Sequence, residues 1–291
     1  MNLNNCTLCP RKCHADRSSY AGCCGASNEI IVAKTMLHQW EEPCISVKNG
    51  AGTIFFSGCS LHCCFCQNHS ISSKLKGNAV SVQQLADMML GLQEQGADNI
   101  ELVTPTHFAY HIIKALDSIK HKLIIPVIYN CGGYELTETI DMLNGYVDVY
   151  LPDLKYFSAQ VSAKYSNAPD YFDVASAAVL HMIEQVGNLK FDKDGKLLKG
   201  TIIRHLVLPN QRHDSMSLLG WIDKNTSPEQ VLVSVMFQYT PFDFIPDEFK
   251  ELKRRLTRME CRTVSDYVDT LSFNGYTQSL SAASEKYVPD F

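Results

Sequence analysis

The chain has 291 residues and a formal net charge of −5, and 45% of its residues are hydrophobic and 20% are charged. This globular composition supplies a sizeable core, and its acidic balance argues against a general binder of nucleic acids or anionic membranes. No apolar stretch reaches the roughly 18–20 residues that span a bilayer, and the polar segment from Met1 to Cys13 lacks the apolar region of a secretory signal. We therefore expect a cytoplasmic protein that binds neither nucleic acid nor membrane.

The cysteines are unevenly distributed. Ten of the twelve lie within the first 66 residues, and Cys131 and Cys261 lie beyond them. A secreted disulfide scaffold would spread its cysteines along a short chain, so clustered thiols in a reducing compartment indicate metal ligands first. The composition predicts three parts: a cysteine-rich N-terminal arm (1–50), a region of alternating strands and helices (51–240), and a C-terminal extension (241–291) that packs on that region.

The N-terminal arm carries four cysteines with the spacing C-x2-C-x3-C-x9-C. They are Cys6, Cys9, Cys13 and Cys23, and Cys24 is an alternative fourth ligand. Four thiolates suit a tetrahedral zinc ion or a fully ligated second iron–sulfur cluster, and we favour zinc. A metal would explain how a short arm without its own core keeps its fold. The alternative is a set of free thiols in an arm without metal.

The second part alternates short apolar strands with amphipathic helices. Ser81 caps one helix, Gln84 completes a capping box, and Gly96 ends the helix, while Asp194-Gly195 indicates a hairpin turn. The expected strands are 52–57, 99–103, 123–129, 147–151, 201–208 and 230–236, and the expected helices are 81–95, 108–116, 136–143, 159–186 and 215–224.

This alternation predicts a mainly parallel sheet with right-handed crossovers. About six strand–helix units fit into the region 51–240, fewer than the eight of a complete barrel. The expected fold class is therefore α/β, a partial (β/α)6 barrel that carries a cysteine-rich N-terminal arm.

The segment that directly follows the first of these strands carries the strongest motif. Cys59, Cys63 and Cys66 have the spacing C-x3-C-x2-C. Three thiolates on one loop can bind three irons of a 4Fe–4S cluster. The fourth iron then lacks a protein ligand, and catalytic metal sites need such an open position. The competing interpretations are a structural zinc ion and a reduced cysteine cluster without metal. We interpret Cys64, inside the motif, as a packing residue.

This motif resembles the signature of the radical S-adenosylmethionine superfamily. Phe65 matches the aromatic residue that precedes the third cysteine in that family and packs near the adenine of the cofactor. The segments 38–68, 146–156, 203–209 and 236–239 are similar to one subgroup, the uncharacterised relatives of the pyruvate formate-lyase activating enzyme. The similarity covers nearly the whole chain.

The resemblance implies an oxidoreductase that holds a 4Fe–4S cluster on Cys59, Cys63 and Cys66 and binds S-adenosylmethionine at the open iron. Flavodoxin or ferredoxin would supply the electron. Reductive cleavage would yield methionine and a 5′-deoxyadenosyl radical, which would abstract hydrogen from a substrate. The cofactor performs this chemistry, and the protein binds, aims and shields it. An exposed cluster also predicts an anaerobic, oxygen-sensitive enzyme.

The substrate is the open part of this interpretation. In the enzymes that the chain resembles, the hydrogen comes from a backbone glycine of a glycyl-radical enzyme, so the first expectation is an activase of such a partner. The alternative with the same chemistry is radical modification of another protein, a peptide or a small molecule. The alternative from another class is a non-catalytic iron–sulfur protein for electron transfer or scaffolding.

Charged residues at the ends of later strands are candidates for cofactor binding. The resemblance places the stretch from Asp153 to Lys155 against the cofactor, with Asp153 at a ribose hydroxyl, an ammonium or a cation and Lys155 at the carboxylate. The alternative is an exposed ion pair. Arg204 lies among apolar neighbours and needs a carboxylate partner from the cofactor or the protein; the resemblance indicates the cofactor. We expect His205 to face the other side of the strand and to be structural.

Polar neutral residues complete the set of candidates. Many members of the family carry Gly-Gly-Glu after the second strand to bind the cofactor ammonium, whereas this chain has Thr104 and Thr106 there and no carboxylate. In the activating enzyme, an aspartate that takes part in cation binding lies near the position that Asn130 occupies here. The amide of Asn130 is neutral, which argues against a cation site in this chain. Gln238 ends the last strand, where it reaches the substrate or packs at the edge.

Overall fold

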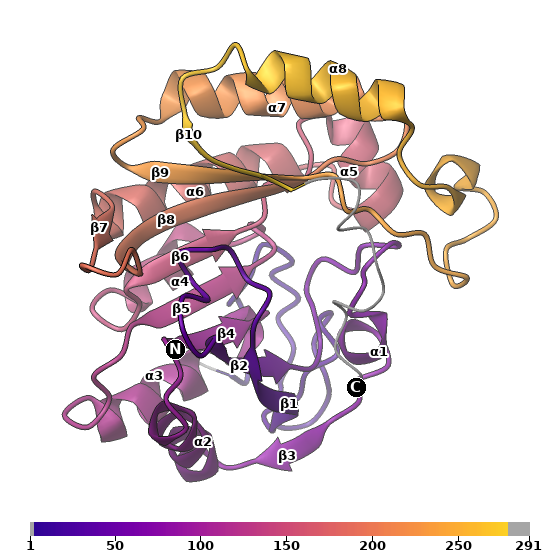
Figure 1. Ribbon diagram of the computed structural model, residues 1–291. Coiled ribbons are helices and arrows are strands. Elements are labelled where there is room, and N and C mark those ends of the chain that lie inside the picture. The colour runs from indigo at the N-terminus through magenta and orange to yellow at the C-terminus, as the bar shows by residue number, and fades with distance from the viewer. Residues whose placement is uncertain (1–2, 279–291) are drawn as a thin grey trace.

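The computed structural model describes residues 3–278, and one curved sheet forms their centre (Figure 1). The strands are β1 (Ile30–His38), β2 (Ala51–Phe56), β3 (Asn78–Val80), β4 (Ile100–Val103), β5 (Val127–Cys131), β6 (Val149–Pro152), β7 (Lys190–Phe191), β8 (Leu197–Leu206), β9 (Val231–Met236) and β10 (Asn274–Gln278). The helices are α1 (His69–Ser72), α2 (Val82–Glu94), α3 (Ala109–Ile119), α4 (Thr137–Met142), α5 (Ala159–Ser166), α6 (Tyr171–Val186), α7 (Arg212–Asn225) and α8 (Arg258–Val268), with 3₁₀ turns at Thr106–Phe108 and Lys250–Lys253.

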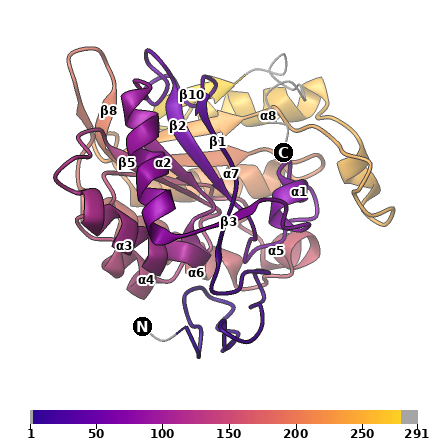
Figure 2. The same ribbon diagram turned by 90° about the horizontal axis from the view of Figure 1, so that it is seen from below.

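The sheet is parallel through most of its width. Its strand order is β10-β9-β8-β6-β5-β4-β2-β1-β3, and neighbours from β10 to β2 pair in parallel. β1 is antiparallel to β2 and to β3, and β7 forms a hairpin with β8. Helices cover the outer face, with α7 and α8 beside β8 and β9 (Figure 1) and α2, α3, α4 and α6 further round (Figure 2). The α/β partial barrel predicted from the sequence is confirmed.

The local signals explain where α2 begins and ends. Ser81 accepts a hydrogen bond from the backbone N–H of Gln84, and the Gln84 side chain accepts one from the backbone N–H of Ser81. These two bonds satisfy N–H groups that a helix N-terminus otherwise leaves without partners. α2 ends at Glu94, and the chain turns out of the helical path at Gly96, whose positive φ of 86° suits glycine. The predicted capping box and helix end are both confirmed.

Several predicted elements differ in extent from the observed ones, among them β8, which begins at Leu197 and not at 201, and proline contributes to two of the differences. The predicted helix 159–186 is two helices, because Asn167 takes a left-handed conformation and Pro169 follows it. The predicted strand 123–129 begins at Val127, directly after Pro126, which has no N–H to donate to a neighbouring strand.

The sheet also contains strands that the sequence did not indicate. β1 lies within the cysteine-rich part and pairs with β2 along most of its length. β10 extends the parallel sheet beyond β9, so the C-terminal part contributes to the barrel wall itself. The last part of the predicted C-terminal extension, 279–291, lies outside the described residues. Within residues 3–278, no helix has the length and apolar character needed to cross a membrane.

Candidate active site

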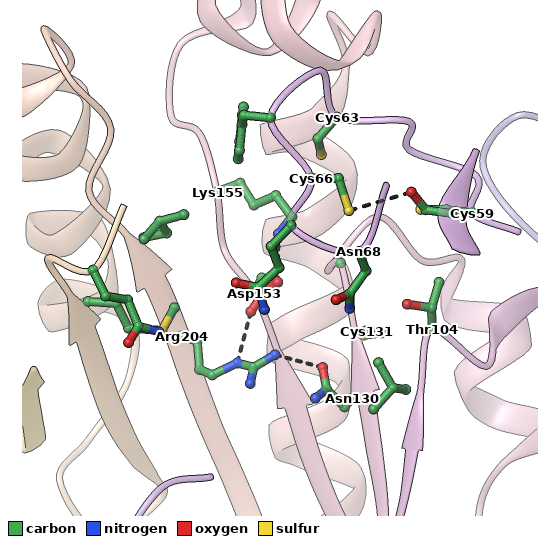
Figure 3. Close-up of a pocket in the computed structure, with 18 of the residues that line it drawn as sticks. Cys59, Cys63, Cys66, Asn68, Thr104, Asn130, Cys131, Asp153, Lys155 and Arg204 are labelled. Carbon is green, nitrogen blue, oxygen red and sulfur yellow. Dashed lines mark hydrogen bonds and ion pairs between the residues drawn. The ribbon is translucent and has the colours of Figure 1, made fainter. Parts of the chain in front are cut away.

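One cavity of about 400 Å³ opens at the carboxyl ends of the barrel strands. This is the edge of a parallel α/β sheet where ligand sites collect. Ten residues that the sequence identified as cluster or cofactor ligands line it together (Figure 3). They are Cys59, Cys63, Phe65, Cys66, Thr104, Asn130, Asp153, Lys155, Arg204 and Gln238. The residues come from the loop after β2 and from the ends of β4, β5, β6, β8 and β9.

The cysteine loop begins at Gly58, where the chain passes very close to the N-terminal arm. Gly58 has a positive φ of 94°, and a Cβ there would lie 2.7 Å from the Cys24 carbonyl oxygen. The next residue, Cys59, donates its backbone N–H to that same oxygen at 3.0 Å. Only glycine allows this approach without strain, so the residue before the first cysteine fixes where the loop starts.

The three thiols each have a hydrogen-bond donor near the sulfur. The backbone N–H of Leu61 is 3.4 Å from Cys59 Sγ, the Ser166 hydroxyl is 3.1 Å from Cys63 Sγ, and the Ser72 hydroxyl is 3.5 Å from Cys66 Sγ. Figure 3 shows the three thiols at one end of the cavity. Donors of this kind stabilise thiolates bound to iron and tune the potential of a cluster.

The electrostatics of the loop favour metal-bound thiolates over free ones. Burial and the neighbouring thiols of Cys63 and Cys66 raise the pKa of Cys59 to about 12, so without metal this thiol is protonated at neutral pH. Metal coordination deprotonates a thiol outright. The donor set of three thiols with sulfur-directed hydrogen bonds and a nearby lysine therefore fits a 4Fe–4S cluster with one open iron.

Phe65 lies within a group of tyrosines beside the loop. Its ring makes edge-on contacts with Tyr156, Tyr165 and Tyr239 at centroid distances of 6.4, 6.3 and 6.2 Å. Tyr239 is buried and donates its hydroxyl to the Leu252 carbonyl, so it packs against the loop. These contacts hold the aromatic ring of Phe65 at the cavity wall.

A chain of charged side chains leads away from the cysteine loop. Lys155 Nζ is 2.6 Å from Asp153 Oδ2, and Asp153 Oδ1 accepts from Arg204 Nε at 2.9 Å. Burial raises the pKa of Asp153, but Arg204 and Lys155 outweigh it and hold that pKa below its usual range. Burial lowers the pKa of Lys155, but Asp153 and the neighbouring Cys63 raise it above its usual range. All three side chains are therefore charged at neutral pH.

The neutral candidates are held by the same network. Asn130 Oδ1 accepts from Arg204 Nη2 at 2.6 Å, and Asn130 Nδ2 donates to the buried Glu101 at 2.6 Å. Arg204 thus takes its partners from the protein, one of the two sources that the sequence left open. Thr104 lies at the end of β4 with a positive φ of 56°, an uncommon conformation for a β-branched residue. His205 is buried, and its Nδ1–H donates to the Leu154 carbonyl, as expected for a structural role.

Several cavity residues were not identified as site residues from the sequence. His38, Trp40, Glu41 and Glu42 come from the end of β1 and the loop after it, and Asn68 follows the cysteine loop. The sequence did contain a signal, because Glu41 and Glu42 lie in a stretch that resembles the subgroup. No strand was predicted before this stretch, so nothing indicated that it reaches the barrel. β1 carries this stretch to the cavity, and that strand was missed.

The N-terminal cysteines form a separate group outside the cavity lining. Cys6, Cys9 and Cys24 are buried, Cys13 is half-buried and Cys23 is exposed. The Cys23 thiol is hydrogen-bonded to Cys13, and the Cys13 and Cys24 sulfurs lie on the same side of Gly22, so both adjacent cysteines border the group. Across residues 3–278, no three His, Cys, Asp or Glu side chains stand together as ligands of a single metal ion. The second metal stays a prediction.

Comparison with known proteins defines the class of this site. Residues 53–212, more than half of the chain, match the Radical SAM superfamily, in which SAM denotes S-adenosylmethionine. An uncharacterized protein of Methanocaldococcus jannaschii is 30% identical over 268 residues, which cover 89% of this chain and 72% of that protein. The chain belongs to the Radical SAM superfamily, as the sequence predicted. That family membership implies a 4Fe–4S cluster, S-adenosylmethionine and oxidoreductase-type radical chemistry.

Solved structures share the fold at low sequence identity. SuiB of Streptococcus suis, bound to S-adenosylmethionine, matches with a TM-score of 0.51 and 15% identity over 78% of this chain and 52% of SuiB. Methylornithine synthase matches with a TM-score of 0.51 and 14% identity over 80% of this chain and 72% of the synthase. The chain spans about half the length of SuiB, so SuiB supports the barrel and not a shared substrate.

Proposed function

We propose that this protein binds a 4Fe–4S cluster on Cys59, Cys63 and Cys66, cleaves S-adenosylmethionine reductively and starts a radical reaction on a substrate in the same cavity. The observation that carries the proposal is the meeting of these three thiols with Lys155, Asp153 and Arg204 on one cavity wall. The cluster with its cofactor supplies an electron and a 5′-deoxyadenosyl radical that abstracts hydrogen.

The residues of the chain bind and orient the cofactor. Lys155 carries its positive charge beside Cys63 and Cys66, where it would receive the cofactor carboxylate. Asp153 is fixed by Lys155 and Arg204, so its carboxylate is positioned before any ligand arrives. Such preorganised charge in a partly closed cavity orients a ligand with little loss of side-chain entropy. Phe65 would pack beside the adenine.

For the substrate, we propose a glycyl-radical enzyme first, which would make this protein an activase that draws its electron from flavodoxin or ferredoxin. The resemblance to relatives of the pyruvate formate-lyase activating enzyme supports this choice. Radical modification of another protein, a peptide or a small molecule is the alternative, since SuiB has been solved with a precursor peptide. A non-catalytic electron-transfer or scaffold role is the alternative from another class, and an open iron site argues against it.

We propose in addition that the N-terminal cysteines hold a second metal, zinc or an iron–sulfur cluster. Cys6, Cys9 and Cys13 would supply three ligands, and the burial of Cys24 favours it over Cys23 as the fourth. Burial raises the pKa of Cys9 to about 12, so this thiol also requires a metal to become a thiolate.

The direct test is cofactor cleavage by the purified protein. The protein is isolated and reconstituted with iron and sulfide without oxygen, then mixed with dithionite and S-adenosylmethionine, and 5′-deoxyadenosine is measured by chromatography. We expect 5′-deoxyadenosine only when the reductant is present, and a lower rate in Lys155→Met. A protein that holds four irons but releases no 5′-deoxyadenosine, with or without candidate substrates, would favour the electron-transfer or scaffold role.

A further inference from the structure

The loop between β1 and β2 lies at the amino ends of the parallel strands, where it closes the barrel interior. It carries two acidic residues into that interior. Cys44 and Ile45 pack against inward-facing residues of the parallel strands, among them Ile128 and Leu151. The Cys44 carbonyl accepts the backbone N–H of Leu197 at 2.9 Å, which ties the loop to β8. This part of the loop therefore belongs to the core, and Glu41 and Glu42, just before Cys44 in the same loop, are held at the cavity wall.

Glu41 lies at the end of the charged chain that leads from the cysteine loop. Arg204 Nη1 is 3.3 Å from Glu41 Oε2, next in line after Lys155 and Asp153. His38 Nε2 lies 3.7 Å from Glu41, but burial and Arg204 lower the pKa of His38 and keep it neutral at pH 7. The order of contacts separates Glu41 from the thiols by three side chains, so it lies beyond the region assigned to the cofactor.

Glu42 is the unusual member of the pair. It is 2% exposed, and its Oε2 has no hydrogen-bond partner. Within residues 3–278, the buried side-chain polar atoms that line this cavity without a partner are Glu42 Oε2 and Asn68 Oδ1, and both are acceptors. Buried acceptors without donors are unfavourable by about 1–3 kcal/mol each unless a ligand or water supplies the donor. The cavity is thus built for a ligand that brings N–H or O–H groups.

The charge balance narrows the kind of donor. Asp153 pairs with both Lys155 and Arg204, and Arg204 also pairs with Glu41. Arg204 is therefore shared between two carboxylates. Arg204 also lies within electrostatic reach of Glu42, so this one guanidinium faces the carboxyl groups of Asp153, Glu42, Glu41 and Glu101. Four acidic groups around one buried arginine are unfavourable unless a further cation arrives. Trp40 lines the same cavity with 63% of its surface exposed, and an indole face attracts cations.

We propose that the Glu42 end of the cavity binds a cationic group of the substrate, an ammonium or a guanidinium, with Glu41 and Trp40 beside it. This inference rests on the proposed radical function, because it assigns the substrate end of the same cavity. The cation can belong to a basic side chain of a peptide or to a free amine. In both cases it supplies N–H donors to the unpartnered acceptors and a further positive charge to the acidic end of the cavity.

The experiment measures the binding of defined probes to the cluster-reconstituted protein with S-adenosylmethionine and without reductant, by anaerobic calorimetry. Blocked lysine and blocked arginine (N-acetyl, N-methylamide) represent a basic side chain of a peptide, and putrescine represents a free amine. Blocked norleucine is the neutral control of similar size. The variant is Glu42→Gln, which removes the charge and keeps the shape. The matched control is Glu94→Gln, at the exposed end of α2.

We expect at least one cationic probe to bind wild type and Glu94→Gln about tenfold or more tightly than blocked norleucine does, and this preference to fall below about threefold in Glu42→Gln. If a blocked amino acid binds more tightly than the neutral control, the cation belongs to a peptide. If putrescine does, the cation belongs to a free amine. Equal binding of the cationic and neutral probes by wild type would overturn the proposal, whether or not the variant folds. So would a preference that persists in Glu42→Gln.

Two further measurements on the same preparations separate this inference from the proposed function. The affinity for S-adenosylmethionine should agree within about twofold between wild type and Glu42→Gln; a loss as large as that of the cationic probe would assign Glu42 to the cofactor and overturn the proposal. Formation of 5′-deoxyadenosine with dithionite tests the radical function by itself. Cofactor cleavage without any cation preference leaves the radical function standing and removes only this inference.

Discussion

The two cysteine groups of this protein have different surroundings. Cys59, Cys63 and Cys66 follow a barrel strand and face a cavity. Cys6 and Leu8 instead pack in a cluster with residues of α3, α4 and α6 and are not among the residues that line that cavity. Three thiols beside a cavity leave a coordination position open for a ligand, whereas four thiols packed in an arm close the coordination shell. The setting of the thiols, more than their spacing, separates a reactive site from a structural one.

The two groups also touch. The Cys24 carbonyl accepts the backbone N–H of Cys59, and Arg11 donates through Nε to the Ser60 carbonyl at 2.9 Å. The arm therefore supports the cysteine loop. Changes to the three motif cysteines of the loop should therefore abolish cofactor cleavage. Changes in the arm should destabilise the loop and lower the rate of cofactor cleavage without abolishing it.

The largest effect is expected from Cys63→Ala. Loss of one of three cluster ligands should lower iron content well below four per chain and reduce 5′-deoxyadenosine formation by at least about a hundredfold. Iron and sulfide analysis and chromatography measure both. The matched control is Cys64→Ala in the same loop, which should keep its iron and most of its activity. If Cys64→Ala lost as much iron as Cys63→Ala, the assignment of the ligands would be wrong.

The next effect is expected in the arm, from Cys24→Ser. This change should remove the second metal and lower the melting temperature by several degrees, with a loss of cofactor cleavage smaller than about tenfold. Metal analysis by mass spectrometry and thermal unfolding are the measurements. Cys23→Ser, at the exposed neighbour, is the control and should retain the metal. Retention by Cys24→Ser together with loss by Cys23→Ser would restore Cys23 as the fourth ligand.

The sequence predicted the cysteine loop and the candidate cofactor residues because these features are local. The spacing of three cysteines after a strand, and charged residues such as Asp153 at strand ends, can be read within a few residues. Parallel strands then bring their carboxyl ends to one edge, so the residues meet without further information. For the same reason the six central strands were predictable from their apolar runs.

The acidic end of the cavity was not predictable in this way. Glu41 and Glu42 reach the cavity only because β1 turns back antiparallel along β2, and the mixed polarity of β1 gives no clear strand pattern. Long-range pairing of this kind depends on packing that no local window contains. The choice between Cys23 and Cys24 was likewise open, because their distances from Cys13 along the chain differ by a single residue and their burial cannot be read from the sequence.

A smaller effect is expected from Arg11→Ala, at the contact between the two cysteine groups. Besides Ser60, the Arg11 guanidinium donates to the carbonyls of Ser166 and Asn167, at 2.9 and 2.5 Å. Loss of these charge-assisted bonds should lower the free energy of unfolding by about 1–3 kcal/mol and speed the loss of iron in air, while activity with freshly built cluster stays close to wild type. Lys12→Gln, an exposed neighbour, is the control. Unchanged stability would mean that the arm does not support the loop.

The smallest effect concerns pH and the buried His107, which lies between the arm and the end of β2. Its Nε2–H donates to the Ser57 carbonyl at 2.8 Å, and its Nδ1 is buried without a partner. Burial lowers the pKa of His107 to about 4, and the charge of Arg17 acts in the same direction. Protonation would place a second N–H where no acceptor exists.

Because the folded pKa of His107 lies below the unfolded value of about 6.5, the unfolded state binds more protons between pH 6.5 and 4. The contribution to stability is full above pH 6.5 and is lost as the pH falls toward 4, by up to about 1.4 kcal/mol per pH unit. Denaturant unfolding of wild type and His107→Gln across this range isolates the histidine, since the other buried histidines are common to both. We expect the difference between the two proteins to shrink as the pH falls. A difference that stays constant with pH would show that His107 takes up its proton as readily in the folded protein as in the unfolded chain, and that the contact between arm and loop tolerates the charge.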